Sequence, residues 1–198
     1  SYFARTDSLT LRPEFVQHAR DLARKSIVLL KNEPVNGSPL LPLRKDLGTI
    51  AVIGTLAADS VSALGSWAGA GRPRDAVPIL DGIRQAVSPG TEVLYAPGAP
   101  VEEIDRSGFE EALRIARAAD VVVLVVGEDR EMSAEARNRS DLGLPGVQQE
   151  LVEAVHATGT PVVTVLTNGR PLAIPWLAEN AQALVEAGLA TSVAAGSG

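Results

Sequence analysis

An uninterrupted apolar segment from Val121 to Val126 restricts the fold of this chain more than any other feature of its sequence. A strand without polar residues must be buried on both faces, which is typical of a parallel sheet that lies between two layers of helices. The segment is much too short to cross a bilayer, because a transmembrane helix needs about 20 apolar residues. We therefore interpret it as a buried strand of an α/β domain.

Apolar strand-like segments alternate with amphipathic segments along most of the chain. The pattern predicts strands at residues 49–54, 91–98, 120–127, 160–169 and 182–187. It predicts helices at residues 13–32, 77–87, 108–119, 145–159 and 175–181. This alternation favours a parallel sheet with helices on both faces, so the predicted fold class is α/β.

The composition agrees with this fold and excludes several classes of function. Hydrophobic residues make up 45% of the chain but aromatic residues only 4%, so valine, leucine, isoleucine and alanine must fill the core. The net charge of −6 provides no basic surface for nucleic acid. The absence of cysteine excludes disulfide bonds, thiolate metal sites and a cysteine nucleophile.

The first residues say little about where the protein acts. The chain lacks the apolar core of a signal peptide. It also starts without methionine, which suggests that it begins partway through a longer protein, so the missing signal peptide says little about the compartment. We expect no membrane-spanning segment. The compartment stays open between a bacterial cytoplasm, the periplasm and secretion, since cytosolic and periplasmic proteins can both lack cysteine.

A charged loop, residues 127–146, follows the strongest predicted strand. It carries five acidic residues and three arginines: Glu128, Asp129, Glu131, Glu135 and Asp141, with Arg130, Arg137 and Arg139. The composition alone favours a solvated loop with internal ion pairs. Its place at the carboxyl end of a strand, however, is where sites of parallel α/β folds lie. The pattern does not distinguish Glu128, Glu131 and Glu135 as candidates for an acid or a base.

Other motifs give weaker indications. The segment Gly65–Gly71 matches only the first half of a dinucleotide-binding fingerprint, because position 74 is arginine. His18 and His156 each fall inside a helical pattern without a partner at metal-ligand spacing. We therefore expect neither a nucleotide cofactor nor a metal ion.

Several segments, in the same order, resemble the second domain of family-3 glycoside hydrolases of the β-glucosidase type. They are "ARKSIVLLKNE", "LPLRK", "IAVIGTLAADS", "LGSWAGAG", "GEDREMSAEARNRSDLGLPG" and "PVVTVLTNGRPLAI". The resemblance runs from about residue 18 to residue 187. It implies a three-layer sandwich with a sheet of about six mostly parallel strands. It also implies a preceding (β/α) barrel domain that carries an aspartate nucleophile.

The resemblance implies roles for three residues. Glu135, in "AEARNR", matches the family's general acid/base, and Arg139 matches an arginine that orients the loop or a carboxylate. Arg137 and Arg139 would oppose the acid role if they touched Glu135, so we expect them to pair with Glu131 or Asp141. Trp67, in "GSWAGAG", either lines the leaving-group side of the site or is structural. The mechanism implied needs no metal ion and no organic cofactor.

We expect residues 1–17 to be an arm from the barrel domain, residues 18–187 to be the sandwich, and residues 188–198 to be a flexible or truncated tail. The expected function is hydrolysis of a terminal β-linked sugar from a β-glycoside or oligosaccharide, with a β-glucoside preferred. β-Xylosides and N-acetylhexosaminides stay open, and so does a homo-oligomer. One alternative is a non-catalytic sugar-binding or interaction module with the same fold. Another is a small-molecule-binding α/β domain of a different family.

Overall fold

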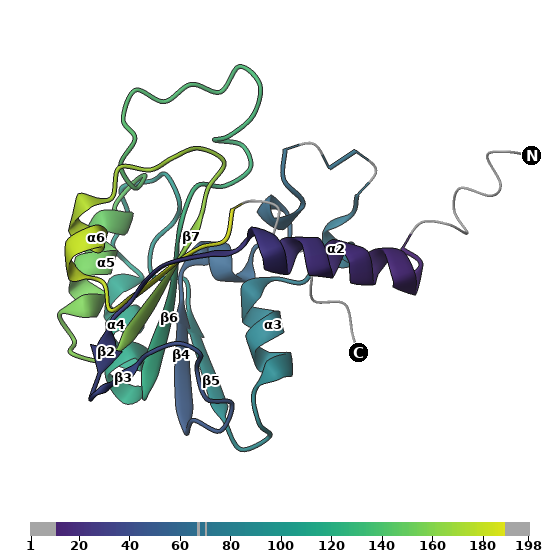
Figure 1. Ribbon diagram of the computed structural model, residues 1–198. Coiled ribbons are helices and arrows are strands. Elements are labelled where there is room, and N and C mark those ends of the chain that lie inside the picture. Colours follow the sequence, from purple (N-terminus) through teal and green to yellow (C-terminus); the bar gives the residue numbers. More distant parts are fainter. Residues whose placement is uncertain (1–10, 67, 70, 189–198) are drawn as a thin grey trace, which may run out of the picture.

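The computed structural model describes residues 11–66, 68–69 and 71–188, and their centre is a six-stranded sheet (Figure 1). The strand order is β1-β8-β7-β6-β4-β5. The strands are β1 (Val28–Asn32), β4 (Thr49–Ile53), β5 (Glu92–Ala96), β6 (Val121–Gly127), β7 (Val162–Thr167) and β8 (Ala183–Glu186). All neighbouring pairs are parallel except β1 and β8, which are antiparallel. A separate hairpin joins β2 (Pro34–Val35) to β3 (Ser38–Pro39).

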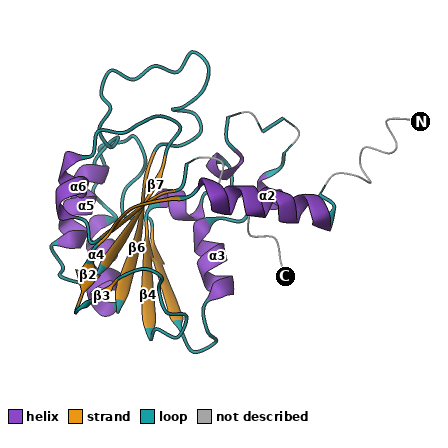
Figure 2. Ribbon diagram, in the orientation of Figure 1, coloured by secondary structure: helices purple, strands orange, loops and turns teal. Residues whose placement is uncertain are grey.

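Helices cover both faces of this sheet, as Figures 1 and 2 show. On one face lie α4 (Phe109–Ala118), α5 (Gln148–His156) and α6 (Pro175–Asn180). On the other lie α3 (Ile79–Ala86) and the 3-10 helix η1 (Thr55–Ala58). Three further short or peripheral helices are α2 (Pro13–Ser26), η2 (Ser62–Leu64) and η3 (Pro73–Asp75). The predicted α/β class, with a mostly parallel sheet between helices, is confirmed.

The apolar segment that defined the fold forms β6, and every residue of this strand is buried. Val122, Leu124 and Val126 pack toward α4 and α5, whereas the alternate residues of the strand pack toward α3 and η1. Each face of the strand therefore needs an apolar side chain, which is why its sequence does not alternate.

The helix predicted at residues 13–32 is wrong over its last six residues, 27–32. The helix α2 ends at Ser26, and the following residues form β1 at the edge of the sheet. Val28 pairs with Glu186 and Leu29 with Val185, so the strand is held by the last strand of the sheet, far away in sequence. A sixth strand is thereby present that the periodicity did not reveal.

Two further features concern the predicted domain limits. α2 crosses the expected limit at residue 17, and Ala23 is the residue of this helix that is buried. Residues 189–198 of the expected tail lie outside the described residues. The domain limits therefore stay a prediction.

No helix of the described chain is long and apolar enough to span a membrane.

The end of β6 depends on a glycine. Gly127 has a φ of 136°, and a Cβ at this position would overlap the backbone carbonyl of Thr167. The buried amide of Gln148 accepts a hydrogen bond from the Gly127 N–H at 2.8 Å and donates one to its carbonyl at 2.8 Å. The place at which the chain leaves the sheet is thus held on both sides.

We predict that Gly127→Ala lowers the free energy of unfolding by about 3 kcal/mol or more, because left-handed strain adds to the overlap with the Thr167 carbonyl. The matched control is Gly90→Ala, where φ is not positive and a Cβ would meet open space. Urea denaturation of both variants measures the difference. Equal stability of the two variants would contradict this account of the strand end.

Candidate active site

The charged loop leaves the carboxyl end of β6 and forms the long excursion at the top of Figure 1. Its first residue after the strand, Glu128, has no exposed surface and donates its backbone N–H to the Thr167 carbonyl at 2.7 Å. The loop therefore begins inside the protein, at the same edge of the sheet as the end of β7. The composition favoured a solvated loop, and this prediction is correct only for the outer part of residues 127–146.

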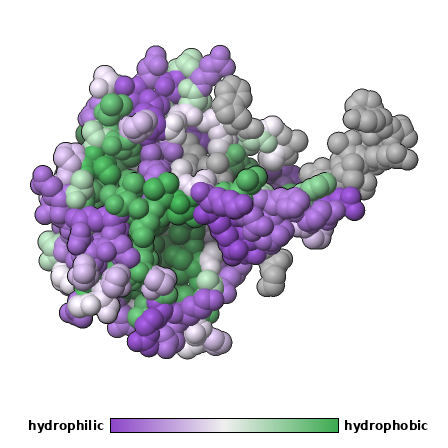
Figure 3. All heavy atoms as spheres, in the orientation of Figure 1, coloured by the Kyte–Doolittle hydropathy of each residue, from purple (hydrophilic) through white to green (hydrophobic). Residues whose placement is uncertain are grey.

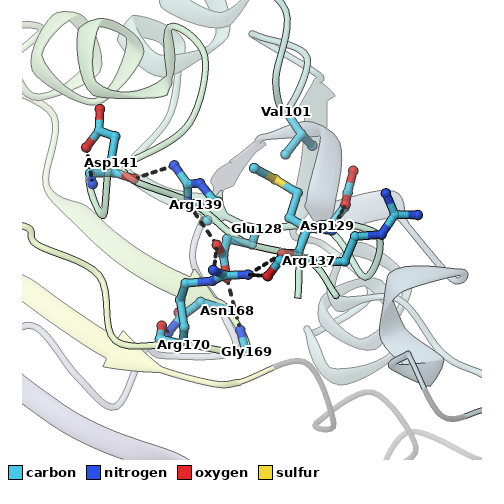
Figure 4. Close-up of polar contacts among 12 residues, drawn as sticks. Val101, Glu128, Asp129, Arg137, Arg139, Asp141, Asn168, Gly169 and Arg170 are labelled. Carbon is cyan, nitrogen blue, oxygen red and sulfur yellow. Dashed lines mark hydrogen bonds and ion pairs between the residues drawn. The ribbon is translucent and has the colours of Figure 1, made fainter. Parts of the chain in front are cut away.

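Two arginines surround the Glu128 carboxylate, as Figure 4 shows. Arg139, on the returning limb of the charged loop, donates from Nη1 to Oε1 of Glu128 at 2.8 Å. Arg170, in the segment between β7 and α6, places Nε 2.9 Å from the same oxygen, at an angle that makes an ion pair rather than a hydrogen bond. We call these three residues the Glu128 cluster. The side chains of the two arginines are 14% and 19% exposed.

The Glu128 cluster is tolerated inside the protein because the charge is paired. An isolated carboxylate would cost several kcal/mol to bury, and only well-placed cations and hydrogen bonds offset that cost. The other carboxylate oxygen, Oε2, accepts the backbone N–H of Gly169 at 3.4 Å. The cluster therefore joins the charged loop to the segment that follows β7.

Arg170 also reaches the outer part of the charged loop. Its Nη2 donates to the backbone carbonyl of Met132, and the same nitrogen lies 3.3 Å from the carbonyl of Arg137. Glu135 lies between these two residues in the sequence. The guanidinium group therefore bonds to both limbs of the turn that carries Glu135.

Glu135 itself is exposed, and no ion pair of the described residues includes it. The next residue, Ala136, has a φ of 61°, a conformation that few residues other than glycine adopt. Arg137 pairs with Glu131 at 3.5 Å, so this expected pairing is confirmed. Arg139 pairs with Glu128, so its expected pairing with Glu131 or Asp141 is wrong. Neither arginine pairs with Glu135.

A second segment, residues 62–66, supports the charged loop from another side. The Ser62 hydroxyl accepts the backbone N–H of Arg130 at 3.2 Å. The Ser66 hydroxyl lies 2.9 Å from the Arg130 carbonyl and 2.7 Å from the Ser133 carbonyl, and donates its single hydrogen to this pair. Trp67 follows directly but lies outside the described residues, so its predicted role stays a prediction.

A cleft of about 490 Å³ lies beside the carboxyl ends of β4 and β5. Carboxylates line it, namely Asp59, Glu102, Glu103, Asp105 and Asp129. Glu135 is not among its lining residues. In the described part of the chain, no group of three acidic or histidine side chains is placed to hold a metal ion.

Three further titratable side chains lie outside the Glu128 cluster. His18 is exposed on α2. His156, at the end of α5, packs edge-on against Trp176 with ring centroids 5.3 Å apart, and burial lowers its pKa. At the end of β8, burial raises the pKa of the Glu186 carboxyl, while hydrogen bonds from Gly188 and Asn168 act in the other direction.

Comparisons with known proteins agree with the α/β fold described above. Residues 27–197 match the Glycosyl hydrolase family 3 C-terminal domain. The chain belongs to this family. It is 40% identical over 190 residues to the periplasmic β-glucosidase of Salmonella typhimurium, covering 86% of this chain and 24% of that protein. It is also 40% identical over 178 residues to a β-xylosidase of Formosa agariphila, covering 87% of this chain and 24% of the relative.

A solved structure of similar fold is a mutant β-glucosidase from Listeria innocua in complex with laminaribiose. The two structures superpose with a TM-score of 0.83 at 33% sequence identity, over 96% of this chain and 25% of the other. The resemblance inferred from the sequence motifs is therefore confirmed. The chain spans about a quarter of the length of these relatives.

Sequence reasoning missed the roles of Glu128 and Arg170. One signal could have indicated the first: a carboxylate that directly follows a strand buried on both faces has no access to water and needs a cation nearby. A second signal concerns Arg170, which follows the next predicted strand of the parallel sheet. The carboxyl ends of neighbouring parallel strands share one edge, so the two side chains could have been placed together.

We predict that Glu128→Gln lowers the free energy of unfolding by about 3–5 kcal/mol, because two partly buried guanidinium groups lose the fully buried carboxylate that pairs with them. The matched control is Glu131→Gln, whose side chain is 62% exposed and pairs with Arg130 and Arg137 on the surface. It should cost about 1 kcal/mol or less. Chemical denaturation measures both values, and similar losses in the two variants would exclude a special role of the buried carboxylate.

Proposed function

We propose that this chain is the C-terminal sandwich domain of a retaining β-glycosidase and supplies Glu135 as the general acid/base. The observation that carries the proposal is the position of this carboxyl. Glu135 lies on an exposed turn whose two limbs are bonded to the buried Glu128 cluster, at the edge of the sheet where sites of such folds lie. Family membership supports the same assignment through the "AEARNR" motif.

The chemistry needs a second carboxyl that this chain is not proposed to provide. In retaining hydrolysis one carboxylate attacks the anomeric carbon, and a second carboxyl about 5–5.5 Å away protonates the leaving oxygen. The second group then takes a proton from the attacking water. The nucleophile is proposed to lie on a (β/α) barrel domain, which would close over Glu135 and bind the sugar.

A β-glucoside is the proposed substrate. The β-glucosidases of Salmonella typhimurium and Listeria innocua support this choice. A β-xyloside is the second candidate, since the similarity to the Formosa agariphila β-xylosidase is equally high. Trp67 is proposed to contact the leaving-group sugar, since the C–H face of a sugar stacks well on an aromatic ring. Arg139 is proposed to act on the charged loop through Glu128 rather than on the substrate.

An apolar surface supports the proposed barrel partner. Most of the large hydrophobic side chains that are exposed in the described residues lie on α2, β1 and the residues next to them: Leu11, Phe15, Leu22, Ile27, Val28, Leu29 and Leu30. Figure 3 shows apolar residues beside α2, across the region that β1 traverses. A concentration of exposed apolar side chains in one region is typical of an interaction site.

The test of the proposed chemistry is Glu135→Ala in the enzyme in which this domain is joined to its barrel. Aryl glucosides with poor leaving groups should lose about 100-fold or more in rate, because they need protonation in the transition state. Substrates with good leaving groups should lose much less, and added azide should restore turnover and yield a β-glycosyl azide. Equal loss for all leaving groups without rescue would move the role to another residue, with Glu131 tested first. No loss at all would favour the non-catalytic alternative.

We predict that the isolated 198-residue chain self-associates through its apolar surface. Leu22→Glu should reduce this association without lowering the melting temperature, because the leucine is 68% exposed. The matched control is Ile104→Glu, which is 78% exposed and belongs to the segment between β5 and α4. Sedimentation velocity measures the association. If both substitutions act alike, the surface on α2 has no special part in it.

A further inference from the structure

We propose that Arg170 is a positioning residue that holds the acid/base carboxyl of Glu135 in its working place. The inference rests on the proposed function of Glu135. Arg170 belongs to neither the charged loop nor the "AEARNR" motif, and it contacts the loop from the segment between β7 and α6. It acts through the backbone of the loop and does not itself touch the reacting atoms.

The contacts of Arg170 enclose the turn that carries Glu135. Its Nη2 bonds to the Met132 carbonyl, three residues before Glu135, and lies 3.3 Å from the Arg137 carbonyl, two residues after it. Bonds to both limbs fix the separation of the limbs. The turn between them then has little freedom, especially since Ala136 is already in the left-handed conformation.

Two contacts on the side away from the turn fix the position of Arg170. Its Nε lies 2.9 Å from the fully buried carboxylate of Glu128, and its own backbone carbonyl accepts a hydrogen bond from Asn168 at 2.8 Å. A planar guanidinium group can face a carboxylate with one edge and carbonyl oxygens with another, which a lysine ammonium cannot do in the same geometry. The rigid end of β6 is thereby connected to the exposed turn through one side chain.

Arg139 and Ser66 also bond to the charged loop, but neither of them bonds to both limbs of the turn at Glu135. Arg139 shares the Glu128 carboxylate, but its second bond goes to the Gly143 carbonyl, well past the turn. The Ser66 hydroxyl lies near the carbonyls of Arg130 and Ser133, both of which precede Glu135. Within the loop, Arg137 joins the two limbs through its ion pair with Glu131 and through its backbone N–H to the Ala134 carbonyl. Among the side chains outside the charged loop, Arg170 is the one whose described contacts reach both sides of Glu135.

The experiment compares Arg170→Lys and Arg170→Met with Glu135→Ala, all in the enzyme joined to its barrel. Arg170→Lys keeps a positive charge beside Glu128, so it maintains the fold if the methionine variant does not. The control is Arg114→Met on α4, which removes an exposed arginine paired with Glu111 and lies outside the candidate site. Rates are measured for aryl β-glucosides and β-xylosides over a range of leaving groups, and folding is checked by thermal melting.

We expect a stable Arg170→Lys variant to lose about 10- to 100-fold in kcat/KM with poor leaving groups, since small displacements of a catalytic group have effects of this size. The kcat/KM for substrates with good leaving groups should change little. In the Glu135→Ala background the same substitution should change the rate by less than about twofold, because its effect depends on the carboxyl that it positions, whereas independent sites would show the same loss in both backgrounds. Arg114→Met should behave as the unmodified enzyme.

Two results would overturn the inference. The first is an Arg170→Lys variant that keeps the full rate with poor leaving groups. The second is a loss of equal size in the presence and absence of the Glu135 carboxyl, which would place the action of Arg170 elsewhere. Both differ from failure of the proposed function, in which Glu135→Ala alone shows no dependence on the leaving group.

Discussion

The buried charge of Glu128 is the constraint on which the candidate site depends. Burying a carboxylate is expensive unless cations and hydrogen bonds surround it, so the chain must bring guanidinium groups to the end of β6. Arg139 arrives from the same loop and Arg170 from the next strand connection. The high charge of residues 127–146 thus has two origins: an inner part that closes the loop onto the protein and an outer part that is solvated.

The sheet makes this arrangement rigid. β6 is apolar on both faces and packs between two layers, so its end has a defined position. Gly127 lets the backbone turn where a side chain would overlap Thr167, and Gln148 bonds to both of its backbone groups. A continuous series of contacts therefore connects the sheet to the turn at Glu135. The strand β6 fixes the Glu128 carboxylate, this carboxylate pairs with Arg170, and Arg170 bonds to both limbs of the turn. Such continuous support is what a catalytic group needs if it is to stay aligned.

Hydrophobic periodicity predicted the elements whose own residues show the pattern of a buried strand or an amphipathic helix. It failed where the secondary structure depends on pairing with a strand far away in the sequence. β4, β6 and β7 are apolar runs, and α4 is a clear amphipathic helix, so each was found within a few residues. β1 was missed because its strand character comes from pairing with β8 at the other end of the chain. Glu128 and Glu135 are the same residue type in one loop, and composition does not separate them. The sequence signal for the buried one is its place directly after a strand that is buried on both faces.

The proposed division of the catalytic groups between two domains is consistent with the same geometry. A loop can hold a carboxyl at a fixed height above a sheet, but it does not by itself place a second carboxyl on the opposite side of a glycosidic bond. Glu135 is exposed and lies outside the acidic cleft of this domain. We therefore propose that the site is completed only at the junction with a second domain, and that the apolar surface of α2 and β1 contacts this domain.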